Sequence, residues 1–246
     1  QRMRIASTGQ FTIDLENNPR GLKGLTFGFG VPSSNKETLG DAEKWWTKSE
    51  HISANEGAKS DPILYLKNKR KAMKKLGYPN GHFEMSVDLF DDMLSHSKVL
   101  QRIGYSLYPA ASDEGVAKSY AENLTDDAKK NAIERLIGAP VVTRDSMAAV
   151  EKFDADSKGL TVSNIENFKS TNVSFIPDGQ IGTIKSVQPI VFQDDPTMRT
   201  AWFDGGRTLL TQRFESKTRT MYVESEMAVL CVPNMPQYMQ IYTVTV

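Results

Sequence analysis

The sequence predicts an α+β protein, and three observations support this fold class. Apolar residues recur at helical spacing between Ser60 and Gly138, they alternate with period two from Asn172 onward, and a shorter alternating stretch lies near the start. This order does not repeat the strand–helix–strand unit from which a doubly wound parallel sheet is built. We therefore expect a helical middle region flanked by β-structure on both sides.

The composition is that of an ordinary globular protein without net charge. The 246 residues include 30 Lys and Arg against 30 Asp and Glu, and 39% are hydrophobic. Proteins that bind nucleic acid or anionic membrane by bulk electrostatics carry an excess of charge, so this class is excluded. The single Cys231 excludes an intrachain disulfide framework and a cysteine-based zinc site. No apolar stretch approaches the roughly 18 residues of a membrane span, and no signal peptide opens the chain, so we expect a soluble intracellular protein.

The first sixty residues predict an extended arm. Phe11–Leu15 and Leu25–Phe29 alternate as strands do, and they flank a turn-forming cluster at Asn17–Gly21. The stretch that follows is polar apart from the pair Trp45 and Trp46, and the arm has too little apolar content for a core of its own. Tryptophans in such an arm pack against something, either the body of the same chain or a neighbouring subunit.

A basic helix begins after Ser60. Ser60 or Asp61 caps it, Pro62 occupies its first turn, and Gly77 ends it. Its apolar residues recur near helical spacing: Ile63, Leu66, Met73 and Leu76. Its other faces carry six cations: Lys67, Lys69, Arg70, Lys71, Lys74 and Lys75. These cations either contact phosphates, as a nucleic-acid-binding module would, or form a solvated or partner-facing surface. The second interpretation is favoured, because no aromatic residue is interleaved and no helix-turn-helix companion follows.

The rest of the chain predicts the remaining helices and strands. In order, we expect a strand at 83–85, a helix capped by Ser86, a helical segment over Val99–Ile103, a loop with some helix over 105–124, a helix from Thr125 to Gly138 and a strand at Val141–Val142. Further strands are expected at Leu209–Phe214, Thr220–Val223, Met227–Val232 and Tyr238–Val246. Pro177-Asp178-Gly179 is a turn signal between two alternating segments and predicts a β-hairpin there.

No catalytic, cofactor or metal site is predicted. The three histidines, His51, His82 and His96, do not pair at the spacing of a helical metal site. A serine nucleophile elbow, a phosphate-binding loop and a dinucleotide fingerprint are all missing from the sequence. The alternative is a hydrolase with an unrecognised carboxylate or histidine site. It would bring together at least two of Asp194, Asp195, His82 and His96.

Several segments, taken in order, resemble the major capsid proteins of tailed phages with the Hong Kong 97-type fold, in particular the family of the lambda major head protein. The resemblance runs from about Phe11 to the end and depends on the order of the pieces. The matching segments are Ser60–Ile63 opening a helix that ends at Gly77–Asn80, then Met85–Val87, Phe90–Ile103, Arg135–Val142, Phe175–Gly179, Met221–Glu224 and Val232–Pro236. Family members have a longer N-terminal arm, and this chain starts at Gln1, so we expect a preceding segment.

The resemblance implies a division into three parts. Residues 1–60 would be an N-terminal segment and an extended-loop hairpin that lies across a neighbouring subunit. Residues 61–78 and 185–228 would form a peripheral domain with the basic helix as its spine. Residues 79–184 and 229–246 would form an axial domain at the centre of each capsomer.

The resemblance also implies a function that depends on interfaces. The chain would be a structural capsid protein, not an enzyme, of a phage or prophage head. It would assemble in the host cytoplasm into hexamers and pentamers of an icosahedral shell, the virion capsid, that encloses DNA. Its partners would be copies of itself, scaffolding and decoration proteins and non-specifically packaged DNA, with no membrane and no cofactor. An encapsulin-like compartment is the alternative within the same class. The expected inter-subunit contacts are Trp45, Trp46, Phe27 and Phe29, and the basic face of the spine helix is Lys67, Arg70, Lys71 and Lys74.

Overall fold

The architecture comes from a computed structural model. It describes residues 2–13, 24–40, 44–45, 60–145, 147–154, 159–179, 182–186, 199–203, 208–215, 220–226 and 229–245. The chain divides into two compact units, Gln1–Ile181 with Met235–Val246, and Gly182–Asn234. Among the described residues, no helix is both long enough and apolar enough to cross a membrane.

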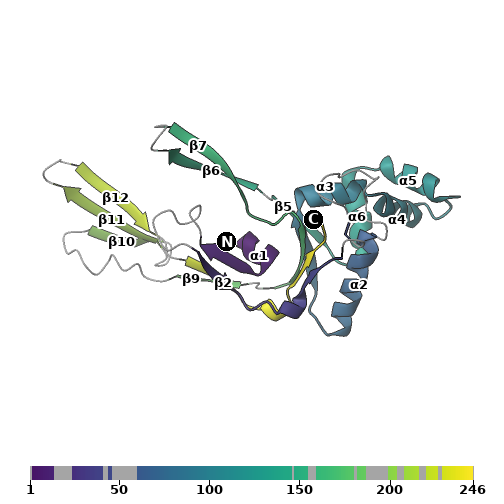
Figure 1. The fold of residues 1–246 in the computed structure, drawn as a ribbon, viewed down its shortest axis with the longest axis horizontal. Helices are drawn as coiled ribbons and strands as arrows, with labels where there is room; N and C mark the ends of the chain where they lie inside the picture. The colour runs from purple at the N-terminus through teal and green to yellow at the C-terminus, as the bar shows by residue number, and fades with distance from the viewer. Residues whose placement is uncertain are drawn as a thin grey trace. The chain divides into compact units, whose positions relative to one another are not determined.

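The first unit contains all six α-helices of the described residues and most of the strands (Figure 1). The helices are α1 (Arg2–Thr8), α2 (Pro62–Lys75), α3 (Val87–Ser95), α4 (Ser97–Leu107), α5 (Glu114–Glu122) and α6 (Asp126–Ile137). The strands are β1 (Gln10–Ile13), β2 (Leu25–Gly28), β3 (Lys36–Thr38), β4 (Gly81–Ser86), β5 (Val141–Arg144), β6 (Met147–Asp154), β7 (Gly159–Glu166), β8 (Asn172–Pro177) and β14 (Gln240–Thr243). This mixture of helices and sheets confirms the predicted α+β class.

A five-stranded sheet organises the first unit, with the strand order β3–β14–β8–β4–β5. The outer pairs, β3–β14 and β4–β5, are parallel, and the inner pairs are antiparallel. Phe83 of β4 and Phe175 of β8 are register partners, and their rings meet edge to face with centroids 5.4 Å apart. Both rings belong to a buried cluster that includes side chains from α2, α3, α4 and α6, so these helices cover one face of the sheet (Figure 1).

The opposite face of the sheet is also covered, in this case by the N-terminal helix. Side chains alternate between the two faces of a strand, so Ile176 and Ile241 point away from Phe175 and from the helical core. Both isoleucines are buried. Helix α1 contacts β8, and the Ser7 carbonyl accepts a 2.7 Å hydrogen bond from the side-chain amide of Asn172. The predicted extended arm therefore begins with a short helix that packs on the body of its own chain.

The helix ends follow the local signals in the sequence. The Asp61 side chain accepts the Leu64 N–H at 3.0 Å and caps α2, and Ser86 caps α3 through the Leu89 N–H at 3.1 Å. Gly138 ends α6 in the left-handed conformation, with φ of 78°. The predicted helices at these places are confirmed. The predicted loop over 105–124 is mostly helical, because α4 continues to Leu107 and α5 begins at Glu114.

Strand pairing differs from the prediction at Pro177-Asp178-Gly179. The expected hairpin is wrong, since β8 pairs with β4 and β14, whereas β9 (Gly182–Ser186) pairs with β13 (Val229–Pro233). The turn signal is present, with Gly179 at a φ of 109°, but it redirects the chain from one sheet into another. A local turn signal shows where the chain bends and does not identify the partner of either strand.

The second unit is built from strands. Strand β9 pairs antiparallel with β13, and β10 (Arg199–Phe203), β11 (Thr208–Glu215) and β12 (Thr220–Glu226) form a three-stranded antiparallel sheet. Met221 and Val223 lie on one face of β12 and are both exposed. The prediction finds β11, β12, β13 and β14 and misses β3, β6, β7 and β10.

The domain boundaries also differ from those implied by the resemblance. Residues 61–78 and 185–228 were expected in one domain, but they fall in different units. The reason is packing: Ile63, Leu66 and Met73 of α2 enter the same buried cluster as α3, α4 and α6. Leu76, expected on this apolar face, is 71% exposed because the helix ends at the residue before it.

Candidate functional site

The predicted inter-subunit contacts separate into two groups. Trp45 has no exposed surface and belongs to the main buried cluster, which corrects the expectation that it is exposed to a neighbouring subunit. Its backbone N–H donates to the Val244 carbonyl at 2.9 Å, so this part of the arm is tied to the segment that follows β14 of its own chain. Trp46 lies outside the described residues. Phe27 and Phe29 are both half-buried.

Phe27 belongs to a two-stranded ribbon, β1–β2, that pairs with no other strand among the described residues. Phe27 is the register partner of Phe11, and the Thr12 and Thr26 hydroxyls on the other face share a 2.9 Å hydrogen bond. Phe29 continues beyond β2, where its N–H donates to the Gly9 carbonyl at 3.2 Å. The predicted hairpin is confirmed in its strands, and its turn lies outside the described residues.

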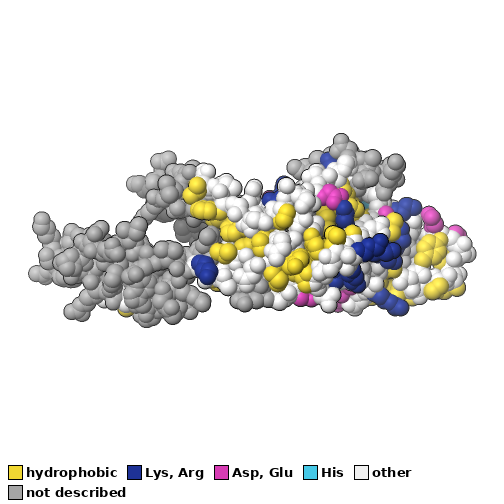
Figure 2. Space-filling view, turned by 90° about the horizontal axis from the view of Figure 1, so that it is seen from below, with side chains coloured by type: hydrophobic (Ala, Val, Ile, Leu, Met, Phe, Trp, Pro, Cys, Tyr) yellow, Lys and Arg dark blue, Asp and Glu magenta, His cyan; other side chains and the backbone are white. Residues whose placement is uncertain are grey.

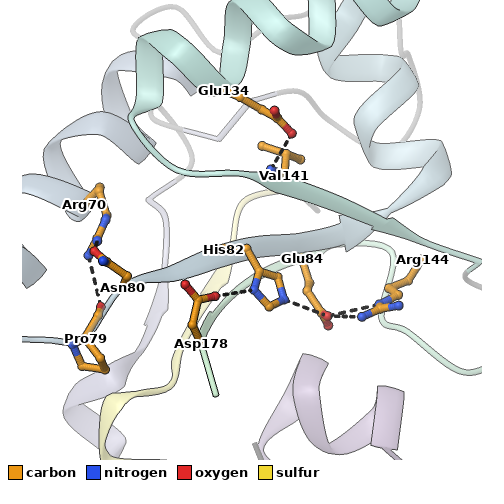
Figure 3. Close-up of polar contacts among 9 residues, drawn as sticks. All are labelled: Arg70, Pro79, Asn80, His82, Glu84, Glu134, Val141, Arg144 and Asp178. Carbon is orange, nitrogen blue, oxygen red and sulfur yellow. Dashed lines mark hydrogen bonds and ion pairs between the residues drawn. The ribbon is translucent and has the colours of Figure 1, made fainter. Parts of the chain in front are cut away.

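The predicted basic face of α2 loses one member. Arg70 is buried, and its guanidinium donates to the Asn80 side chain at 2.9 Å and to the Pro79 carbonyl at 3.5 Å (Figure 3). The same group lies 5.3 Å from the centroid of the Phe175 ring. Burial lowers the pKa of Arg70, and the charge of Asp178 partly offsets this effect. Arg70 therefore fastens α2 to the sheet instead of facing a partner.

The three remaining lysines of this face, together with Lys75, form an exposed surface that we term the lysine stripe. Its members are Lys67, Lys71, Lys74 and Lys75. At about 100° per residue they occupy one arc of α2, opposite the buried Leu66 and Met73. In Figure 2, Lys and Arg side chains gather over the part of the first unit where Figure 1 places α2. Within the described part of the chain, no carboxylate lies in ion-pair range of these four ammonium groups.

Lys69 does not belong to the lysine stripe, because its ammonium group contacts other side chains of the same chain. It forms an ion pair with Glu37 of β3, and its ammonium group lies 5.2 Å from the Tyr65 ring centroid and 5.6 Å from that of Tyr242. The Tyr65 hydroxyl also donates to Glu37 at 3.3 Å. These contacts join α2 to the edge of the central sheet. Burial raises the pKa of the Tyr242 hydroxyl, and the nearby Glu37 charge raises it further.

An exposed apolar surface on α4 and α5 was missed by the sequence analysis. We term it the tyrosine tip, and its members are Tyr105, Leu107, Tyr108, Val116 and Tyr120, each 38–43% exposed. The Tyr108 and Tyr120 rings stack with centroids 5.5 Å apart. The spacing of Tyr105 and Tyr108, and of Val116 and Tyr120, places each pair on one helical face, and this signal was available in the sequence. It was overlooked because 105–124 was assigned mainly to loop.

A glycine allows the two helices of the tip to meet. An added Cβ on Gly104 would lie 1.9 Å from the Ala117 carbonyl oxygen, far inside contact distance. The backbones of α4 and α5 therefore touch at this point, and both residues are buried. This close approach fixes α5 against α4 and holds the tyrosine rings beside one another.

Four charged side chains form a cluster across the sheet, on the face that α1 covers. His82 lies between Asp178 and Glu84, with Nδ1 3.4 Å from Asp178 Oδ1 and Nε2 3.3 Å from Glu84 Oε1 (Figure 3). Arg144, at the end of β5, donates its Nε to the same Glu84 oxygen at 3.1 Å. A carboxylate only accepts hydrogen bonds, so a ring with a carboxylate at each nitrogen is fully satisfied only as an imidazolium.

The same contacts shift the pKa values of the cluster. The hydrogen bond to Glu84 is the main cause that raises the pKa of His82, and it outweighs burial, which lowers it. Burial raises the pKa of Glu84, but the hydrogen bonds from His82 and Arg144 and the positive charges of these two groups together outweigh it, so the pKa lies below its ordinary value. The cluster is thus most stable with His82 protonated and Glu84 ionised.

His96 and Ser60 form a buried pair that is not a nucleophile with its base. Nδ1 of His96 accepts the Lys98 N–H at 3.2 Å and caps α4, so the neutral ring carries its proton on Nε2. Nε2 lies 3.0 Å from the Ser60 hydroxyl and donates to it, while the hydroxyl faces the Trp45 carbonyl at 3.4 Å. A base that already carries a proton on the nitrogen facing the serine does not activate it.

The residues of the hydrolase alternative are not brought together where they can be placed. His82 and His96 have separate partners, on the sheet and at the start of α4. Asp194, Asp195 and His51 lie outside the described residues. In the described ranges, no group of three or more His, Cys, Asp or Glu side chains is arranged to hold a metal ion.

Comparisons with known proteins give a likeness to a solved structure. No family model matches the chain, and no curated protein matches it. Among solved structures, the chain is similar to a phage-related protein from Bordetella bronchiseptica, with 13% identity and a TM-score of 0.43. The match covers 86% of this chain and 57% of that one, so the chain spans little more than half the length of the matched structure.

Proposed function

We propose that this chain is the structural major capsid protein of a tailed phage or prophage, with the Hong Kong 97-type fold and the lambda major head family as its relatives. Copies would form hexamers and pentamers of an icosahedral head that assembles in the host cytoplasm around a scaffolding protein. The shell, joined by a decoration protein, would enclose DNA without reading its sequence. The order of the matching segments, from the capped helix at Pro62 to the closing strands, is the sequence support for this proposal.

The observation that carries the proposal is the number of strands that pair only within small ribbons. Among the described residues, β1–β2, β6–β7 and β9–β13 each form a two-stranded sheet. A two-stranded ribbon is at best marginally stable in water and needs a further surface to cover it. Met147 of β6 and Val162 of β7 are exposed apolar side chains on such a ribbon. Neighbouring copies in a shell would supply the missing cover.

The compact body fits the role of a rigid block that carries these ribbons. Its helices and sheet share one buried cluster, so it can fold before assembly. Zero net charge suits a protein that packs many copies closely, since strong self-repulsion would oppose contact. The buried Ser60–His96 pair, with its proton on the wrong nitrogen for catalysis, favours this structural role over a hydrolase.

The test is electron microscopy of the protein expressed with its neighbouring scaffold gene. We expect closed shells of uniform size, or capsomer rings, with Phe27→Ala and Phe29→Ala reducing their yield while the monomer stays folded. Shells that contain a protein cargo instead of DNA would indicate the encapsulin-like compartment. A monodisperse monomer in the presence of the scaffold, at all protein concentrations tested, would contradict the proposal.

A further inference from the structure

We propose that the tyrosine tip of one copy docks on the lysine stripe of a second copy of this chain. The inference rests on the proposed function, because it names the two surfaces through which copies of the body would meet. It concerns the first unit alone, where both surfaces are described.

The tyrosine tip has the character of a protein-binding surface. Tyr105 and Tyr108 lie on one face of α4, and Val116 and Tyr120 lie on one face of α5. The stacked Tyr108 and Tyr120 rings join the two pairs into an exposed apolar patch, which is typical of an interaction site. Stacking fixes the orientation of Tyr108 and Tyr120, and the Gly104–Ala117 approach fixes the two helices. A preorganised aromatic surface loses little conformational entropy on binding. Tyrosine is also among the residues most enriched at the centre of interfaces.

The tip carries negative charge around its apolar centre. Asp113, Glu114 and Glu122 are exposed at the two ends of α5, whose one cation, Lys118, lies 3.9 Å from Glu122, while Arg102 of α4 pairs with Asp61. Asp113 accepts the Val116 N–H at 2.9 Å, so its carboxylate is held at the start of the helix. A partner that covers the tip must therefore combine apolar contact with positive charge.

The lysine stripe offers this combination. Its four ammonium groups have no carboxylate in range within the described part of the chain, and Leu64, which is 39% exposed, lies on the same arc at the beginning of α2. Lysine stems are apolar and pack along hydrophobic surface, while their ammonium groups can lie over tyrosine rings. Figure 2 shows the two surfaces as separate areas, with blue side chains in one and yellow side chains beside magenta ones in the other.

A second copy is a better occupant of the stripe than nucleic acid. Phosphate binding needs cations and gains nothing from the exposed leucine, and no aromatic side chain is interleaved with the lysines for a base to stack on. Each copy carries one tip and one stripe, which are different surfaces, so the contact is heterologous and repeats from copy to copy. A contact that repeats in this way builds a closed ring when the rotations between successive copies add up to a full turn.

Charge exchange on the full-length protein tests the docking. We expect Lys71→Glu with Lys74→Glu to raise the concentration needed for self-association at least about tenfold, since like charges would then face each other. Glu114→Lys with Glu122→Lys should do the same. A chain with all four changes should regain association, because the complementarity is restored with opposite signs. The matched control is Lys169→Glu with Lys185→Glu, two exposed lysines that are not part of α2, which should change little.

A cross-link locates the contact directly. In a Cys231→Ser background, chains with Tyr120→Cys and chains with Lys71→Cys should form a disulfide only when mixed, and the pair Tyr120→Cys with Lys169→Cys should not.

Shells whose formation is unaffected by the charge exchanges, with no such cross-link, would overturn the docking and leave the capsid proposal intact. Cross-linking and charge rescue without any shell would support the docking while contradicting the capsid. A stripe variant that loses only salt-dependent DNA binding would assign the lysines to nucleic acid and overturn the proposal.

Discussion

Two neighbouring parts of the first sixty residues are built in opposite ways. The hairpin β1–β2 pairs with itself, and Phe27 stays half-buried. Residues 36–40 and 44–45 instead join the body, where β3 extends the central sheet and the side chains of Leu39 and Trp45 lie in the main cluster. The backbone contact continues past β3, since the Leu39 N–H donates to the Thr243 carbonyl at 3.0 Å.

This difference shows that an extended arm is not one functional piece. Both parts alternate a few apolar residues with polar ones, so composition does not separate them. What separates them is the free edge of β14, which accepts β3 in parallel register. A deletion that tests the arm in assembly should therefore remove the hairpin and spare residues 31–45, because removal of the second part would also damage the core.

The largest expected effect contrasts these two parts directly. Trp45→Ala should lower the free energy of unfolding by about 3–5 kcal/mol, because a fully buried large side chain leaves a cavity. Phe27→Ala should lower it by only about 1 kcal/mol, because its ring is partly exposed on a two-stranded ribbon. Denaturant titration of both variants measures the difference. Equal losses of stability would show that the hairpin belongs to the folding core as much as residue 45 does.

The next effect concerns the junction beneath the tyrosine tip. Gly104→Ala should destabilise the protein by about 1–3 kcal/mol, because the added methyl group meets the Ala117 backbone and separates α4 from α5. Gly138→Ala is a useful comparison, since no atom lies within 4 Å of its added Cβ and its cost arises from the left-handed backbone alone. Amide hydrogen exchange should show faster exchange in α5 for Gly104→Ala only. Unchanged exchange in α5 would contradict the close approach.

A smaller effect is expected on the covered polar face of the sheet. Glu84→Gln should cost about 1–2 kcal/mol, because a neutral amide cannot accept from His82 and Arg144 as a carboxylate does. Arg144 is 40% exposed, so solvent screening keeps the loss modest. Asp178→Asn, at a 62% exposed carboxylate, should cost less. Thermal unfolding of both variants gives the ranking, and a reversed ranking would contradict the central place of Glu84.

The smallest effect is a dependence on pH. The folded-state pKa of His82 is raised above its usual 6.5, so its contribution to stability is complete below that value and is lost as pH rises through the folded pKa. The pKa of Glu84 is lowered from 4.5, so its contribution is present above 4.5 and is lost as pH falls through the folded value. We expect the free energy of unfolding to fall as pH rises above 6.5 through the raised pKa of His82, and His82→Gln to flatten this decline. A decline of the same slope in the variant would place its origin elsewhere.

The candidate surfaces were predicted in part. The lysines of α2 could be identified from spacing, because residues three and four apart share a helical face. Arg70 was assigned to the wrong face of α2 because its position borders the buried arc of the helix. Only its contacts with Phe175 of the sheet and with Asn80, just before β4, show that it lies on the buried side. The tyrosine tip was overlooked because proline, glycine and serine punctuation near it indicated a loop.

The sequence by itself determined the elements whose signals are local. Side-chain caps such as Asp61 and Ser86, the left-handed Gly138 and the apolar spacing of α2 and α6 act within a few residues, so they can be interpreted before any contact is known. Only the tertiary structure decided which strands pair, that β8 and β9 belong to different sheets, and that Trp45 is buried. The reason is that strand pairing and core packing bring together residues that lie far apart in the chain. Alternation of apolar and polar residues indicates that a strand has two different faces, but it does not show which element covers either face.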